Sequence, residues 1–275
     1  MTVVRKKVVE EVDEYKMEVK ILNKDKKNKI LSFLLKDSTP AFANAVRRTV
    51  VESVPTLAIE NIELRKNSSV LYDEMIALRL GLISLTTDLK TYELPESMDE
   101  LSAKNSVKLI LKAKGPKTVY AEEIESKDPK IKPAFPKTPI VKLLKGQELE
   151  FEATAVLGVG KEHAKWIPGL VHYKYAPTFT LTKSGEKNEE MGKKFPQLFE
   201  VKSGKVSIKK DALYTSAAYE ACEESYPKDV KLSYSDKEFI FTIESFGQLE
   251  PEEIITTACD VLGQQFDEFI KLLKK

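Results

Sequence analysis

Apolar and polar residues alternate along both ends of the chain. The stretch EYKMEVKIL (14–22) alternates with period two, and KILSFLLKD (29–37) follows it after a polar turn. Successive side chains of a strand point to opposite faces, so these two stretches predict a β-hairpin. Near the C-terminus, VKLSYSDKEFIFTIES (230–245) predicts a second hairpin.

Two segments instead repeat their apolar residues with the period of a helix. In STPAFANAVRRTVVESVP (38–55), four apolar residues fall at i, i+3, i+4 and i+8, Ser38 or Thr39 can cap the helix, and Pro40 suits its first position. The segment LEPEEIITTACDVLGQQFDEFIKLLKK (249–275) predicts one long C-terminal helix. Its apolar stripe consists of Ile254, Ile255, Ala258, Val261, Leu262, Phe266, Phe269, Ile270 and Leu273. Both helices need a surface against which to bury these stripes.

The middle of the chain favours sheet. TLAIENIELRKNSS (56–69) predicts a strand, and VLYDEMIALRLGLISL (70–85) predicts a short helix that stops near Gly81. Further strands are predicted in SVKLILKAK (106–114), TVYAEEIE (118–125), PIVKLLKG (139–146) and ELEFEATAVLG (148–158). Between them, the proline-rich KDPKIKPAFPKTP (127–139) indicates an exposed loop.

A polar segment separates this sheet region from the C-terminal part. Residues 183–197, KSGEKNEEMGKKFPQ, are typical of a linker or flexible loop. After it, KVSIKK (205–210) predicts a strand and DALYTSAAYEACEESY (211–226) a helix.

Composition and charge narrow the classes of function. The chain of 275 residues carries 44 Lys and Arg against 43 Asp and Glu, a net charge of +1, so no bulk positive charge attracts nucleic acid. No apolar run approaches the roughly 18 residues of a membrane span, and the N-terminus does not resemble a signal peptide. Two cysteines, Cys222 and Cys259, cannot form a disulfide framework. We therefore expect a cytoplasmic protein.

One short stretch has the spacing of an iron–sulfur motif. In SAAYEACEESYP (216–227), Ser216, Tyr219, Cys222 and Tyr226 stand where the bacterial ferredoxin run C-x2-C-x2-C-x3-C-P has cysteines. A cluster needs four strong ligands, and serine and tyrosine are weak substitutes for thiolate. We expect no iron–sulfur cluster, although a redox protein stays open as an alternative.

Other candidate chemistry fails on inspection. GVGKEHAKWIPG (158–169) is glycine-rich, but Ala155 and Glu162 stand where a phosphate-binding loop needs Gly and Ser or Thr. His163 and His172 have no cysteine or carboxylate at metal-ligand spacing. We expect no catalytic, cofactor-binding or metal-binding residue.

Four blocks of sequence carry a resemblance to a known family. DSTPAFANAVRRTVVESVPTLAIENIEL (37–64), SSVLYDEMIALRLGLISL (68–85), LLKGQELEFEATAVLGVGKEHAKWIPG (143–169) and FTIESFGQLEPEEIITTACDVLGQQFDEFIKLL (241–273) resemble the D subunit of archaeal DNA-directed RNA polymerase. The family counterparts are the third-largest subunit of eukaryotic RNA polymerase II and the N-terminal region of the bacterial alpha subunit.

The resemblance implies an α+β fold in three parts. A discontinuous dimerisation subdomain, a sheet with two amphipathic helices, would comprise residues 1–52 and 224–275. A mostly β insert subdomain would span 53–178, and a small ferredoxin-like subdomain lacking cluster ligands would span 179–223.

The resemblance also implies a role and partners. Such a subunit is non-catalytic, pairs with the small L subunit and forms the platform on which the large subunits assemble. Its further partners in the assembled enzyme would be the large B subunit and the small N and P subunits. The expected subunit interface comprises Phe42, Ala45, Val46, Arg47, Arg48, Val50, Phe266, Phe269, Ile270 and Leu273. His163, Lys165 and Trp166, in a loop expected to be exposed, are possible contacts to other subunits. A nucleic-acid binder using the lysines of 24–29 or 127–145 is a further alternative, but those runs are interleaved with acids, and we expect no strong DNA binding by the chain alone.

Overall fold

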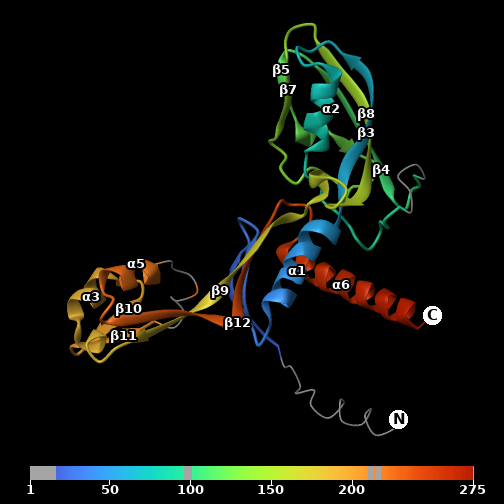
Figure 1. Cartoon of the computed structure of the whole chain (residues 1–275). Coiled ribbons are helices and arrows are strands. Elements are labelled where there is room, and N and C mark those ends of the chain that lie inside the picture. Colours follow the sequence, from blue (N-terminus) through green and yellow to red (C-terminus); the bar gives the residue numbers. More distant parts are fainter. Residues whose placement is uncertain (1–16, 96–100, 210–213, 215–217, 275) are drawn as a thin grey trace. The chain divides into compact units, whose positions relative to one another are not determined.

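The structure, a computed structural model, describes residues 17–95, 101–209, 214 and 218–274, and combines α-helices with several antiparallel sheets (Figure 1). The described residues form two compact units. One contains 17–24, 31–44 and the described part of 172–242, and the other contains 25–30, 45–171 and 243–274. We refer to them as the arm unit and the insert unit.

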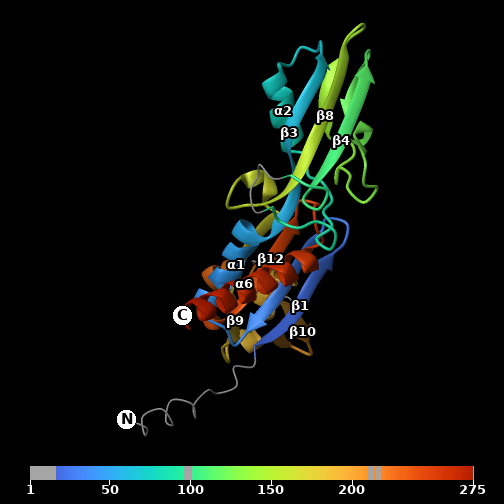
Figure 2. The same ribbon diagram turned by 90° about the vertical axis from the view of Figure 1, so that its right-hand side faces the viewer.

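The insert unit is built on a sheet with the strand order β3-β8-β4-β6. These strands are β3 (Pro55–Asn67), β8 (Glu148–Val159), β4 (Ser106–Lys114) and β6 (Glu125–Ser126), and Figure 2 shows the first three side by side. β3 pairs antiparallel with β8 from Pro55 opposite Val159 to Asn67 opposite Leu149, with bulges after Ile59 and after Leu64. The sequence predicted β3, β4 and β8 within one or two residues, because their apolar residues alternate cleanly.

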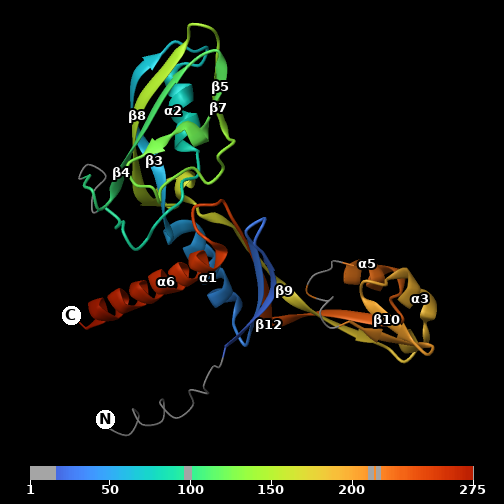
Figure 3. The same cartoon turned by 180° about the vertical axis from the view of Figure 1, so that it is seen from behind.

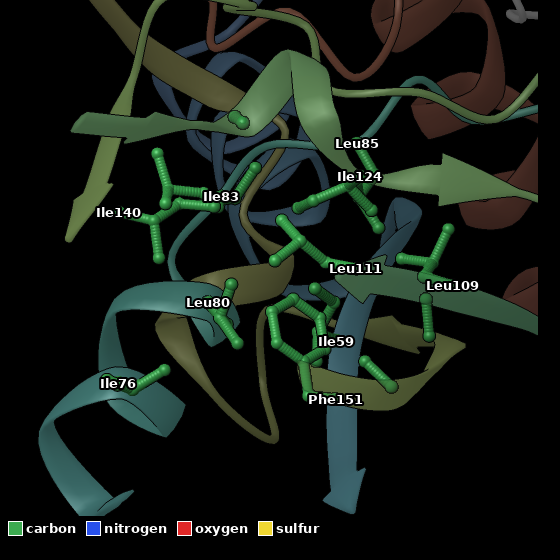
Figure 4. Packing of buried hydrophobic residues seen from close by; sticks show 14 of the residues in the cluster. Ile59, Ile76, Leu80, Ile83, Leu85, Leu109, Leu111, Ile124, Ile140 and Phe151 are labelled. Carbon is green, nitrogen blue, oxygen red and sulfur yellow. The ribbon is translucent and has the colours of Figure 1, made fainter. Parts of the chain in front are cut away.

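One face of this sheet is covered by apolar packing. Helix α2 (Asp73–Gly81) places Ile76 and Leu80 against the sheet residues Ile59 and Phe151 (Figure 4). Strands β5 (Lys117–Tyr120) and β7 (Pro139–Leu143) form a two-stranded sheet beside it, joined to β6 through a short 3-10 helix, Ala121–Glu123. The predicted strand 118–125 is therefore split after Tyr120. The predicted end of α2 near Gly81 is confirmed.

The arm unit contains most of a second sheet, ordered β1-β2-β12-β9. Its strands are β1 (Glu18–Asp25), β2 (Ile30–Lys36), β12 (Val230–Ser245) and β9 (Gly169–Leu181). The first predicted hairpin is confirmed for its described residues, while 14–16 lie outside them. The second is wrong, because 230–245 form one continuous strand of 16 residues. Its polar centre contains no glycine or proline, and pairing along the sheet keeps it extended.

Residues 183–208 fold at the far end of β9 and β12 in Figure 1. They form a 3-10 turn (Gly185–Lys187), α3 (Glu189–Lys194) and the hairpin of β10 (Phe199–Lys202) and β11 (Lys205–Ile208), and α5 (Ala218–Ser225) packs with them. The predicted linker at 183–197 is therefore wrong. Met191, Phe195 and Phe199 belong to a buried cluster, because apolar residues spaced too irregularly for a stripe meet in the tertiary fold.

Two longer helices complete the chain. Helix α1 spans Pro40–Ser53, and the Thr39 hydroxyl accepts a hydrogen bond from the Phe42 backbone N–H at 3.2 Å, which confirms the predicted cap. Helix α6 spans Pro251–Leu273, with Pro251 at its start and acidic residues in its first turn, as predicted.

Candidate subunit-docking surfaces

The two halves of α6 differ in their burial. In the first half, Ile254 and Ala258 are buried in the core. In the second half, Phe266, Phe269, Ile270 and Leu273 are exposed, from 45% for Ile270 to 70% for Leu273. Their spacing places them on one face of the helix. Figure 3 shows α6 as a single helix that runs to the C-terminal end of the chain. Contiguous exposed apolar surface of this kind marks interaction sites.

Helix α1 offers less of its predicted face. Val46 and Val50 are buried within the chain itself, at 5% and 0% exposure, and so leave little surface for the contact with a partner that the sequence predicted. Phe42 and Ala45 are half-buried. The predicted helix has two apolar sides, and the sequence could not tell which one the chain's own core would use.

The two adjacent arginines of α1 differ as well. Arg47 is half-buried, whereas Arg48 is exposed. The Arg48 guanidinium donates from Nε to one oxygen of Glu52 at 3.1 Å and from Nη2 to the other at 3.2 Å. This i, i+4 pair already satisfies part of the Arg48 fork, so a partner carboxylate would have to compete with Glu52.

Trp166 is a core residue of the insert unit, and the expectation that it is exposed is wrong. Its side chain is 3% exposed, and the indole Nε1–H donates to the Val156 carbonyl at 3.1 Å. The Thr56 hydroxyl donates to the Trp166 carbonyl at 2.7 Å. A Cβ on Gly158 would lie 2.4 Å from the indole, so glycine makes room for the ring. The sequence around Trp166 has no apolar periodicity that would have indicated this packing.

Lys165 and His163 lie beside this tryptophan but closer to the surface. The Lys165 ammonium donates to the Ile59 carbonyl at 3.0 Å and pairs with the Glu60 carboxylate. The same ammonium nitrogen lies 4.4 Å from the centre of the Trp166 ring. The exposed His163 accepts the Lys165 backbone N–H at Nδ1, at 3.1 Å. Of the three residues predicted together in this loop, His163 alone is exposed.

These two residues line a groove that the sequence did not predict. A cavity of about 230 Å³ lies between α2 and β3, lined by Ile59, Glu60, Ile62, Ala77, Leu78, Gly81, Leu82, His163 and Lys165. The lining residues Leu78 and Leu82 are exposed, and so is Met75, three residues before Leu78, so that the three are spaced at i, i+3 and i+7. More apolar residues stand in 70–85 than one buried stripe needs, which is the signal that could have revealed this second face.

A second, mostly apolar cavity of about 400 Å³ lies on the other side of α2. It is lined by Val70, Leu71, Arg79, Thr118, Pro139, Ile140, Val141, Lys142 and Leu144. The Arg79 guanidinium donates to the carbonyls of Ile140 and Pro139, each at 2.7 Å, and so ties α2 to β7. Exposed Val70 and Tyr72 extend the apolar surface at the start of α2.

The stretch with ferredoxin spacing is filled by packing side chains. Cys222 is fully buried, and burial raises the pKa of its thiol to about 11. Tyr219 is also buried, and Tyr226 packs edge-on against Phe195 with ring centres 6.3 Å apart. Ser216 lies outside the described residues. Within the described part of the chain, no three His, Cys, Asp or Glu side chains are grouped as metal ligands.

None of the helices in the described ranges is long and apolar enough to cross a membrane.

Comparison with known proteins begins with the insert unit. Residues 59–168, which lie within that unit, match the family model of the RNA polymerase Rpb3/RpoA insert domain. This part of the chain is therefore similar to the insert domain of RNA polymerase subunits of the Rpb3/RpoA class.

Relatives along nearly the whole chain define the family further. The DNA-directed RNA polymerase subunit Rpo3 of Pyrococcus furiosus is 39% identical, over 94% of this chain and 98% of its own length. The subunits Rpo3 of Thermococcus kodakarensis (38%; 94% and 98%) and Methanobrevibacter smithii (36%; 87% and 92%) are similar. The chain belongs to the Rpo3 family of archaeal DNA-directed RNA polymerase subunits.

Proposed function

We propose that the chain is a non-catalytic assembly subunit that pairs with the small L subunit through α6 and the exposed part of α1. The observation that carries this proposal is the exposed apolar face of Phe266, Phe269, Ile270 and Leu273. Each large apolar side chain covered by a partner contributes about 1.5 to 3 kcal/mol. Ala45 of α1, half-buried in the chain alone and in the same unit as α6, would extend the contact. Family membership supports assembly within a cytoplasmic polymerase.

Variants of α6 test this pairing. Phe266→Ser and Ile270→Ser should each weaken association with coexpressed L at least tenfold, because each loses apolar area at the contact. Leu272→Ser is the matched control: Leu272 is 67% exposed on the same helix, but it lies about 110° around the helix axis from the centre of the stripe, so its loss should have a much smaller effect on binding. Co-purification and titration with labelled L measure the effect. Equal binding by all three variants would contradict the proposal.

We further propose that the α2 surface binds other subunits of the enzyme. The candidates are the large B subunit and the small N and P subunits. The exposed row of Met75, Leu78 and Leu82 and the cavities on both sides of α2 support this role. His163 and Lys165 line the nearer cavity and would supply polar contacts at its edge. A charged substitution such as Leu78→Glu should then block later assembly while leaving the pairing with L intact.

We also propose that the region 179–223 is a ferredoxin-like subdomain that holds no iron–sulfur cluster. Its support is chemical: the stretch provides one thiol, Cys222, and that thiol is buried with a raised pKa, whereas cluster ligation needs thiolates. Apolar and aromatic packing takes over the stabilising role that a cluster would have. The chain itself is expected to bind DNA only weakly, since its charges balance.

A further inference from the structure

Phe135 is an exposed aromatic residue on a loop whose backbone is firmly held. The ring is 54% exposed, although it lies between Pro133 and Pro136 in the connection from β6 to β7. Exposed phenylalanine is common enough singly, but a rigid, projecting one is a typical anchor of protein interfaces. Such an anchor needs a pre-organised loop and other apolar side chains beside it.

Hydrogen bonds tie the loop to the segment that follows α2. Ala134 donates its backbone N–H to the Ser84 carbonyl at 2.8 Å, and Thr86 donates its backbone N–H to the Lys132 carbonyl at 2.9 Å. Between these two bonds, Pro133 and Leu85 form an isolated antiparallel β-bridge. Within the loop, Thr138 donates its backbone N–H to the Phe135 carbonyl at 3.1 Å. Two prolines restrict the remaining backbone freedom. The entropy cost of ordering this loop has already been met in the free subunit.

The chain before α6 forms the floor under Phe135. Gly247 has a positive φ of 96°, and a Cβ there would lie 2.6 Å from the Ala134 Cβ and 3.4 Å from the Phe135 ring. Glycine at this position lets the loop approach. The floor is itself anchored, because the Gln248 carbonyl accepts the Thr87 N–H at 2.9 Å and the Gln248 side chain donates to the Ile167 carbonyl at 3.2 Å.

A second exposed ring stands next to this floor. Phe246 directly precedes Gly247 and is 42% exposed. Its backbone N–H donates to the Pro168 carbonyl at 2.9 Å, so this part of the chain is held as well. We call Phe135, whose ring lies next to Gly247, and Phe246, the residue before that glycine, the apolar knob; both belong to the insert unit.

The charges around the knob indicate the chemistry of its partner. Lys132 and Lys137 flank Phe135 in sequence, are exposed, and make no ion pair with a described residue. The neighbouring Lys130 differs, since it pairs with Asp88 at 2.6 Å. Two unpaired ammonium groups beside exposed apolar rings fit an apolar socket with a carboxylate rim.

We propose that the knob of Phe135 and Phe246 docks into an apolar socket rimmed by Asp or Glu on another subunit of the polymerase. This surface is separate from the α6 face and from the α2 grooves, and it rests on the proposed function only in that the partner belongs to the same enzyme. The aromatic rings supply the affinity, and Lys132 and Lys137 select the acidic rim.

A photo-crosslinker at position 135 tests the contact directly. Replacing Phe135 with p-benzoyl-phenylalanine in the assembled polymerase, followed by irradiation and peptide sequencing, should yield a peptide of another subunit that combines apolar residues with Asp or Glu. Cross-linking to nucleic acid, to a peptide without acidic residues, or to nothing would overturn the proposal.

Substitutions then measure the energetics with the subunit so identified. Phe135→Ala and Phe246→Ala should each weaken the association between this chain and that subunit about tenfold or more. The double variant Lys132→Glu, Lys137→Glu should also weaken this association, and by a larger factor at low salt than at high salt. Ile110→Ala, which alters a side chain 41% exposed elsewhere on the insert unit, is the control and should change nothing.

Two further measurements separate this result from other failures. Unchanged thermal unfolding of Phe135→Ala would show that the fold is intact, as its exposure predicts. Association with L should stay at the wild-type level in Phe135→Ala and fall in Ile270→Ser, so loss of the knob contact and failure of the α6 pairing give different patterns. Wild-type assembly by Phe135→Ala and Phe246→Ala together would refute the knob.

Discussion

Whether a large apolar residue of this protein belongs to the core or to an exposed surface depends on the residues that pack around it. Trp166 and Phe266 are both large aromatic residues among polar neighbours in sequence. The first is 3% exposed and donates to a backbone carbonyl, whereas the second is 57% exposed on α6. An aromatic ring stabilises whichever apolar surface surrounds it, so its type alone does not say whether it serves the core or an interface.

Asp88 provides a test at this scale. Its carboxylate accepts hydrogen bonds from the Lys130 ammonium, the Thr91 hydroxyl and the Lys90 backbone N–H, which lower its pKa to about 2 from a usual 3.8. A lowered carboxyl pKa adds stability above the unfolded value, and that stability is lost as the pH falls through the folded value.

We therefore expect Asp88→Asn to destabilise the insert unit by about 1 kcal/mol or less at pH 6, since Lys130 is exposed and the pair is screened. The difference from wild type should shrink between about pH 4 and pH 2. Denaturant unfolding across this range measures it, and a difference independent of pH would contradict the assigned cause.

At the scale of elements, the outer face of the insert sheet is held by charges rather than by apolar contacts. Glutamates of the central strand β8 face basic residues on both neighbouring strands. Glu152 pairs with Arg65 of β3 and Lys108 of β4, and Glu148 pairs in the same way with Lys66 and Lys114. The glutamates thus join three strands, and the face is suited to water rather than to an apolar partner.

Removing one junction of this network should have a small, salt-dependent effect. Glu152→Gln should lower the unfolding temperature by about 1 to 3 °C at low salt, and by less in about 1 M NaCl, where charges are screened within about 3 Å. Glu125→Gln is the matched control, because Glu125 is exposed on β6 of the same sheet and makes no ion pair with a described residue. Calorimetry of both variants at two salt concentrations decides; equal effects would exclude the network.

At the scale of the whole molecule, each unit has a core of its own. The insert unit packs the cluster around Phe151 and Leu109, and the arm unit packs the cluster around Met191 and Cys222. The arm cluster consists of apolar and aromatic side chains within the described residues, and its cysteine is one packing residue among several. Stability of that unit should therefore not depend on metal.

Cys222→Ala tests this independence. Loss of the buried sulfur should cost about 1 kcal/mol, a typical value for a small core truncation, and affect unfolding of the arm unit alone. Association with L should stay unchanged, and protein purified without oxygen should contain no iron and show no thiolate-to-iron absorption in either form. Iron in wild type that disappears in Cys222→Ala would contradict the proposed absence of a cluster.

The sequence by itself determined those elements whose pattern is local. The alternation in β3, β4 and β8 and the stripes and caps of α1 and α6 lie within one segment each, and so does the family resemblance. The exposed apolar residues in the second half of α6 also belong to the stripe that the sequence predicted, because the helix has more apolar positions than one core contact uses.

Only the tertiary structure decided which apolar residues the chain keeps for itself. It buried Val46, Val50 and Trp166, left Phe266 and Leu273 exposed, and drew 183–197 into a core. It also extended 230–245 into one strand and placed the Phe135 ring next to Gly247. The physical reason is that burial depends on surfaces contributed by residues distant in sequence, whereas periodicity shows only that a segment has an apolar face.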